Sequence, residues 1–168
     1  MSFMFHPNPY KDPRAVNPID EGREISARMV CGLLPIAKRI AAEIKAGARR
    51  VGIDGYPGAE FSVLRRALEQ QLPGQICWIQ AESLMKSEEE IDAIIAPYLP
   101  EDREIDPVLL YGRRYEGGYE GIQSTESVRR AASMLDGEKT VLIIGRGALV
   151  RALEEKYDLR VWLDITPK

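Results

Sequence analysis

The stretch Val51-Gly52-Ile53-Asp54-Gly55-Tyr56-Pro57-Gly58-Ala59-Glu60-Phe61-Ser62-Val63-Leu64, residues 51–64, decides the fold. A short apolar run over 50–54 predicts a buried strand, and helical spacing over 59–71 predicts a helix after a turn of glycine and proline. The same alternation recurs along the chain. It predicts strands over 75–80, 140–144 and 159–165, a shorter one over 108–111, and helices over 86–96, 124–135 and 148–156. Strands that alternate with helices indicate an α/β protein with a three-layer, doubly wound parallel sheet.

The N-terminal part has a different pattern. Residues 1–18 contain four prolines, which lack an N–H donor and fix φ, so we expect an extended arm. Residues 19–168 are predicted to form one α/β domain, and its first part, 19–47, is a long leading helix by its apolar spacing. Gly32 and Pro35 are expected to bend or break this helix, and Gly47 to end it.

Composition excludes several classes of protein. A formal charge of −3 argues against a general nucleic-acid or membrane-surface binder. No apolar stretch reaches the ~20 residues of a membrane span, and we expect a cytoplasmic protein. Cys31 and Cys77 lie in apolar runs and are predicted to be reduced core residues. The sequence has one histidine, His6, so we predict no metal centre and no cofactor.

The turn after the first strand can be compared with a phosphate-binding loop, which follows the pattern GxxxxGK[S/T]. The residues that fit are Gly55, Gly58, Ala59 and Ser62. Glu60 occupies the second glycine position and Phe61 the lysine position, so the cation that would neutralise phosphate is missing. A carboxylate at ~4 Å from a phosphate costs about 4 kcal/mol at an effective dielectric of ~20. We therefore expect ATP to bind weakly here or not at all.

Other candidate site residues lie near strand ends. The strand over 140–144 ends in Ile-Gly-Arg-Gly and offers no acid for Mg²⁺, and we predict no catalytic residue. Asp54 and Asp164 stand near the ends of other strands, where a lone acid is more often a loop anchor than a metal ligand. Arg146, Arg113 and Arg114 are candidate phosphate contacts, with solvated loop arginines as the alternative.

Longer segments of the sequence resemble two known families. IDGYPGAEFSVLRRAL resembles the P-loop of uridine-kinase-like small-molecule kinases, IDGxPGAGKSTLxxxL. LIIGRGALVRALEEKYDLRVWLDIT is similar to the later part of that fold, with Gly145 matching the glycine of a Glu-Gly pair and Ile144 replacing its acid. The phrases FHPNPYKDPRAVN, MKSEEEIDAIIAPYL and GRGALV…LRVWLDI resemble the N-terminal region of a group of bacterial class I mannose-6-phosphate isomerases. In that group a kinase-like domain with a degenerate loop precedes a cupin isomerase domain.

The resemblance implies a P-loop kinase-like domain without its own isomerase chemistry, because one histidine cannot build the family's zinc site of several His and Glu residues. Three functions stay open. The first is a non-catalytic module with a structural or regulatory role beside a sugar-phosphate isomerase, with a cupin domain or a second copy as partner. The second is a sensor of a phosphorylated metabolite or nucleotide. The third is an active nucleoside or sugar kinase with an atypical loop.

Overall fold

The computed structural model describes residues 27–72, 74, 76–99 and 113–164. The chain divides into two compact units, residues 1–31 and residues 32–168. The predicted arm over 1–18 with His6, the first part of the leading helix and the strand over 108–111 lie outside the described residues. Cys31, at the end of the first unit, is exposed, so its assignment to the core was wrong, whereas Cys77 is half-buried. Both cysteines are free, and no helix in the described ranges is long and apolar enough to cross a bilayer.

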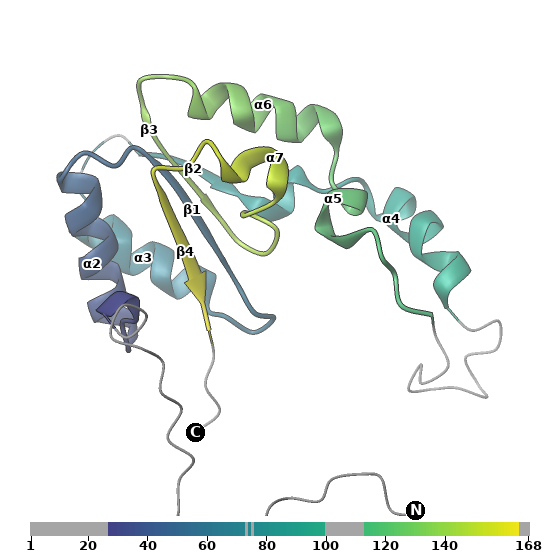
Figure 1. The fold of residues 1–168 in the computed structure, drawn as a ribbon, viewed down its shortest axis with the longest axis horizontal. Coiled ribbons are helices and arrows are strands. Elements are labelled where there is room, and N and C mark those ends of the chain that lie inside the picture. The colour runs from purple at the N-terminus through teal and green to yellow at the C-terminus, as the bar shows by residue number, and fades with distance from the viewer. Residues whose placement is uncertain (1–26, 73, 75, 100–112, 165–168) are drawn as a thin grey trace, which may run out of the picture. The chain divides into compact units, whose positions relative to one another are not determined.

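The second unit contains a four-stranded sheet in the order β2-β3-β1-β4, and every pairing in it is parallel (Figure 1). The strands are β1 (Arg50–Gly55), β2 (Ile76–Gln80), β3 (Thr140–Ile144) and β4 (Leu159–Leu163). The helices are α2 (Leu33–Lys45), α3 (Phe61–Gln71), α4 (Glu88–Ile95), α5 (Gly118–Ile122), α6 (Thr125–Leu135) and α7 (Arg151–Glu154), with short 3₁₀ turns η1 (Ala81–Leu84) and η2 (Ala96–Tyr98). The α/β class and the parallel sheet expected from the sequence are confirmed.

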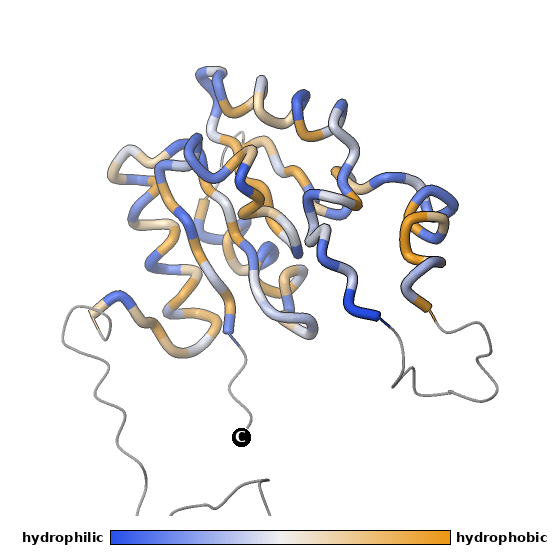
Figure 2. Tube along the Cα trace, turned by 45° about the vertical axis from the view of Figure 1, so that its right-hand side comes forward, coloured by the Kyte–Doolittle hydropathy of each residue, from blue (hydrophilic) through white to orange (hydrophobic). Residues whose placement is uncertain are grey.

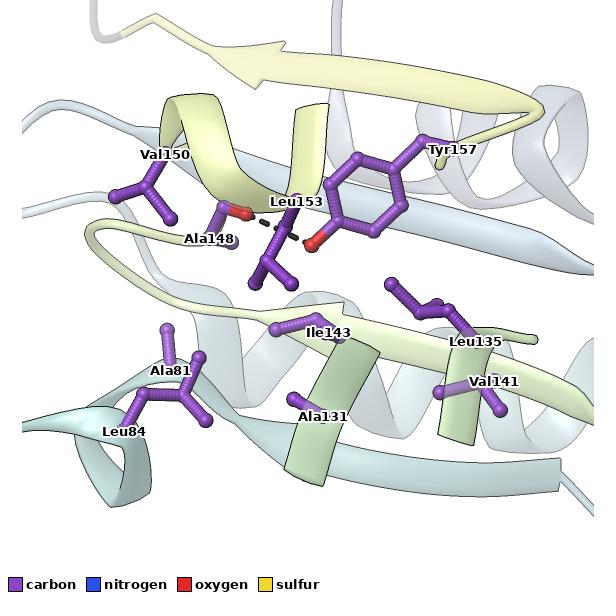
Figure 3. Close-up of a cluster of buried hydrophobic side chains, with 10 residues drawn as sticks. All are labelled: Ala81, Leu84, Ala131, Leu135, Val141, Ile143, Ala148, Val150, Leu153 and Tyr157. Atoms are coloured by element: carbon purple, nitrogen blue, oxygen red, sulfur yellow. Dashed lines mark hydrogen bonds between the residues drawn. The ribbon is translucent and has the colours of Figure 1, made fainter. Parts of the chain in front are cut away.

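Two hydrophobic clusters lie on opposite faces of the sheet. The first joins β3, together with Cys77 and Ile79 of β2, to η1, α6 and α7. Figure 3 shows its ten buried side chains. The second joins β1, the other face of β3 and half-buried residues of β2 and β4 to α2 and α3. Figure 2 shows hydrophobic stretches in the central strands and mixed colours along the flanking helices. Helices therefore cover both faces of the sheet, as apolar residues on both sides of β3 require.

Local signals explain most element boundaries. Gly32 adopts φ 91°, a left-handed conformation, and α2 begins directly after it, so the predicted leading helix is broken there. Ser87 and Glu90, spaced as a capping box requires, form one at the start of α4: the Ser87 hydroxyl accepts from the Glu90 N–H, and the Glu90 carboxylate accepts from the Ser87 N–H. The predicted helix over 148–156 is shorter in the structure, because residues 146–149 form a turn and α7 covers only Arg151–Glu154.

The two tryptophans have different environments. Trp78 of β2 packs against the second cluster, with the guanidinium carbon of Arg65 5.2 Å from its ring centre. Trp162 of β4 is 56% exposed and contacts the exposed ring of Tyr56, with ring centres 5.7 Å apart. Trp162 is therefore no core residue.

Candidate functional site

The topology brings two connections together at the carboxyl edge of the sheet. The chain leaves β1 toward β2 through α3, and it leaves the neighbouring β3 in the opposite direction, toward β4, through α7. α3 packs on the face of the second cluster and α7 on the face of the first. In open α/β sheets, ligands bind at such a switch point, in the crevice outside the carboxyl ends of the strands. We call residues 55–60 the first loop and residues 145–150 the second loop.

Asp54, near the end of β1, joins the first strand to the second loop. It is 6% exposed, and its carboxylate accepts hydrogen bonds from three backbone N–H groups: Gly55 at 2.8 Å, Gly147 at 3.1 Å and Leu149 at 3.0 Å. Three backbone donors satisfy a buried carboxylate without any cation. Asp54 is thus the loop anchor that the sequence favoured over a metal ligand.

The first loop is a tight turn rather than an open cradle. The N–H of Ala59 donates to the Tyr56 carbonyl at 3.0 Å, Pro57 follows Tyr56, and Gly58 adopts φ 99°. Proline at the second position and a positive φ at the third are the arrangement of a type II turn. The N–H of Ala59 is therefore engaged within the turn.

Other N–H groups around this turn are engaged as well. The Gly55 N–H donates to Asp54, that of Tyr56 to the Leu163 carbonyl at 3.1 Å, and that of Phe61 to the Ala59 carbonyl at 2.9 Å. Within the described residues, the N–H groups of Gly58, Glu60 and Ser62 have no acceptor. A phosphate-binding loop works by aiming successive N–H groups at phosphate oxygens. Here most of those groups are used by the fold itself.

Gly55, the first glycine of the compared pattern, has a packing reason of its own. A Cβ on Gly55 would lie 2.5 Å from the carbonyl oxygen of Leu163 and 2.8 Å from its Cβ. β4 approaches β1 too closely there for any side chain. Gly55 does not adopt a positive φ, and its presence is explained by strand packing without a ligand.

The second loop presents Arg146 to solvent. Gly145 and Gly147 on either side adopt φ 128° and 82°, and the exposed Arg146 side chain makes no hydrogen bond or ion pair with any residue that the structure describes. A Cβ on Gly145 would lie 2.8 Å from a carboxylate oxygen of Glu82. The carbonyl of Gly147 accepts from the buried amide of Gln123 at 2.9 Å.

Sequence reasoning missed two residues at this edge, Glu82 and Gln123. Glu82 follows β2, and its carboxylate beside Gly145 adds negative charge close to the position where an anion would meet Arg146. Gln123 directly precedes the N-cap residue of α6, Ser124, and its side-chain amide donates to the Gly147 carbonyl of the second loop. A single glutamine before a helix start carries no sequence signal for such a contact, because the partner is 24 positions away.

The structure brings together some of the predicted site residues and not others. Those that lie at the carboxyl edge by their strand and loop positions are Asp54, Gly55, Gly58, Ala59, Glu60, Ser62, Arg146 and Asp164. Glu60 is exposed and precedes α3 without capping it by its side chain. Arg113 and Arg114 lie on another segment, which the Arg113 N–H ties to the Tyr98 carbonyl at 2.8 Å. Among the described residues no hydrogen bond links either arginine to Arg146.

The phrase KYDL in the closing segment has a structural explanation. The Tyr157 hydroxyl donates to the Ala148 carbonyl at 2.8 Å, as Figure 3 shows, and burial together with the charge of Asp54 raises the pKa of Tyr157. Asp158 accepts from the N–H groups of Arg49 and Arg50, both at 2.9 Å, and from the Arg50 guanidinium. These hydrogen bonds lower the pKa of Asp158 and raise that of Arg50. Tyr157 thus supports the second loop, and Asp158 joins β4 to the start of β1.

The fold and the edge define the class of protein, which is an α/β domain with a strand, a turn and a helix in the order of a phosphate-binding loop. Four backbone N–H groups around that turn, those of Gly55, Tyr56, Ala59 and Phe61, donate within the fold. The chain belongs to the family described as Domain of unknown function (DUF8485), whose model matches residues 33–168. No curated protein and no solved structure matches the chain. In the described ranges, no three His, Cys, Asp or Glu side chains converge in a way that could hold a metal ion.

Proposed function

We propose that this chain is a non-catalytic domain of the P-loop kinase-like type, with a structural or regulatory role beside a sugar-phosphate isomerase of the mannose-6-phosphate isomerase family. The observation that supports a non-catalytic role is the hydrogen bonding of the Asp54 carboxylate. This acid stands near the end of β1, and its oxygens accept three backbone N–H groups of the loops. An acid in this state holds two loops together, because Oδ1 accepts two of these N–H groups and Oδ2 accepts the third.

The charges at the same edge support the proposal. Transfer of a phosphoryl group depends almost wholly on positioning and on stabilisation of negative charge. The compared pattern has lysine where Phe61 stands, and Phe61 packs against the second cluster instead. Glu60 and Glu82 place two carboxylates at this edge, whereas Arg146 is the one cationic side chain in the first and second loops. Such an edge disfavours the polyphosphate of a nucleotide.

The experiment is a comparison of the wild-type chain with a variant that restores the pattern, Glu60→Gly with Phe61→Lys. We expect no thermal shift of the wild type with millimolar Mg-ATP and no ADP formation. The restored variant is expected to gain a shift, because it replaces a carboxylate by an N–H-presenting glycine and adds a cation. Phe61→Ala controls for lost packing. Steady ADP formation by the wild type, with nucleosides or sugars as acceptors, would establish the kinase alternative instead.

The isomerase association is tested separately, by sedimentation of the chain with a purified cupin isomerase domain of that family. A complex that co-sediments at micromolar concentrations is the expected result. Failure to bind would remove the isomerase from the proposal and leave its non-catalytic part to the nucleotide experiment.

Arg146 favours a second candidate function, the sensing of a phosphorylated metabolite. It is an exposed arginine between two glycines of positive φ at the switch point, and it makes no ion pair in the part of the chain that the structure describes. A sugar phosphate at 100 times its Kd adds about 2.7 kcal/mol of stability. A thermal shift with glucose 6-phosphate or mannose 6-phosphate that disappears in Arg146→Ala would support the sensor, whereas Arg129→Ala on α6 is the control. Equal behaviour of both variants would contradict it.

A further inference from the structure

β4 is an edge strand, and its two faces are unequally covered. It pairs with β1 on one side and with no other strand among the described residues. Leu159, Val161 and Leu163 pack against the second cluster, on the face that α2 and α3 cover. The intervening Arg160 and Trp162 point to the other face and are exposed, since the first cluster reaches β2 and β3 but includes no residue of β4.

The backbone of β4 has hydrogen-bonding groups directed outward. The Leu163 carbonyl accepts from Tyr56, so Leu163 faces the β1 side. Along a strand in a parallel pair, the N–H and C=O groups of successive residues alternate between the two sides. Arg160 and Trp162 therefore direct these groups away from β1. An edge of this kind is a template for pairing with another strand, and LRVWL contains none of the proline or lysine that proteins use to block it.

The uncovered face of β4 carries an aromatic surface beside a cation. Trp162 is 56% exposed and Tyr56 is 54% exposed, and their rings meet edge to face at an angle of 78°. The Arg160 guanidinium is held by Glu154 of α7 at 2.7 Å. Tryptophan, tyrosine and arginine are the residues most enriched at the energetic centres of protein interfaces.

We propose that the edge of β4 pairs with β4 of a second copy of this chain, antiparallel, about a two-fold axis at Val161. In this register Arg160 of each copy lies opposite Trp162 of the other. Each such pair exchanges two backbone hydrogen bonds through the groups that point outward. Each also places a guanidinium beside an indole ring, an attractive cation–π arrangement. The two four-stranded sheets become one sheet of eight strands.

The sequence of β4 favours a second copy over a different partner because it is complementary to itself. A two-fold axis requires that each side chain meet a suitable partner within the same segment. Arg-Val-Trp satisfies this requirement, since the residues on either side of Val161 attract each other. A shift of the axis to Arg160 or Trp162 would place two arginines or two tryptophans opposite each other. This inference does not depend on the proposed function.

The test is sedimentation equilibrium of the full chain over a range of concentrations, with Met134→Lys on α6 as the control for adding a lysine at an exposed apolar position. We expect a reversible dimer for the wild type and for Met134→Lys. Trp162→Lys places a lysine opposite Arg160 in both pairs, and it should weaken the dimer at least about tenfold. Adding Arg160→Glu to Trp162→Lys creates two opposite-charge pairs and should restore much of the loss.

A monomeric wild type, or a Trp162→Lys variant that dimerises as well as the control, would overturn the proposal. Thermal unfolding of each variant shows that the monomers are folded.

Cross-linking reads the register directly. In a background of Cys31→Ser and Cys77→Ser, chains with Arg160→Cys are mixed with chains with Trp162→Cys. A directly opposed hydrogen-bonded pair has Cα atoms about 5.5 Å apart, within disulfide range. We expect a disulfide-linked dimer in the mixture and little in either variant alone. No cross-link in the mixture, or equal cross-linking of one variant with itself, would refute this pairing.

Discussion

Replacing Asp54 by alanine removes the acceptor of three backbone N–H groups at once. Two of them, from Gly147 and Leu149, lie more than 90 residues away in sequence, so the variant disconnects the second loop from β1. Each donor left unpaired in a buried place costs about 1–3 kcal/mol. Because the Leu149 N–H is only part-buried and the lost charge no longer needs burial, we expect a total loss of about 3–5 kcal/mol.

Asparagine at position 54 should cause only part of this loss of stability. Its carbonyl oxygen can replace the carboxylate oxygen that accepts from Gly55 and Gly147, whereas its amide group would meet the N–H of Leu149 as a second donor. We therefore expect Asp54→Asn to cost about 2 kcal/mol, less than alanine. Urea unfolding with a common slope measures both losses. In a chain of this length, the alanine variant should also melt about 10 °C lower.

A small loss of stability in Asp54→Ala would refute the anchoring role of Asp54. An acid kept for a metal ion or a substrate is a burden to the folded state, so its neutralisation leaves stability unchanged or raises it. A loss below about 1 kcal/mol in Asp54→Ala would show that the three hydrogen bonds do not anchor the second loop. Asp92→Asn, at an exposed position on α4, is the matched control and should stay within about 0.5 kcal/mol of the wild type.

Two further predictions concern the support of the same loop and strand. Gly52→Ala places a Cβ 2.6 Å from Leu149 and 2.7 Å from the Tyr157 ring, so it should cost about 1–3 kcal/mol in urea unfolding, and an unchanged midpoint would contradict this packing. The pKa of Asp158 is lowered in the folded state by Arg50. Its stabilisation is therefore fully present above the unfolded value of about 3.9 and lost as pH falls toward the folded one, so the advantage of wild type over Asp158→Asn should shrink below about pH 4.

The order of strands and helices could be predicted from local patterns. The apolar run over 140–144 coincides with β3, and the Ser87–Glu90 capping box marks the start of α4, because both signals act within a few residues. The end of the chain was less predictable. Residues 148–150 have helical composition, yet Ala148 and Leu149 lie in a turn and α7 begins only at Arg151. The Leu149 N–H donates to Asp54, 95 positions away, and a contact at this separation leaves no local sequence pattern.

The candidate site was predictable in kind and not in detail. The mismatch of Glu60 and Phe61 to a phosphate loop is visible in the sequence, and so is the choice between anchor and ligand for Asp54. Arg113 and Arg114 were grouped with Arg146 as candidate phosphate contacts, and the structure shows the Arg113 N–H donating to the Tyr98 carbonyl. Sequence separation gives no measure of which loops meet, since that depends on strand order.

By itself, the sequence determined that this chain forms an α/β fold with parallel strands and that its first turn lacks the charges of a phosphate-transferring loop. Both follow from the identity and spacing of neighbouring residues. Only the tertiary structure decided that β3 lies between β1 and β2, that Asp54 is enclosed by N–H groups of the second loop, and that Trp162 is exposed on an edge strand. These properties depend on strand order, which places residues far apart in sequence within hydrogen-bonding distance and, among the described residues, leaves β4 paired on one side only.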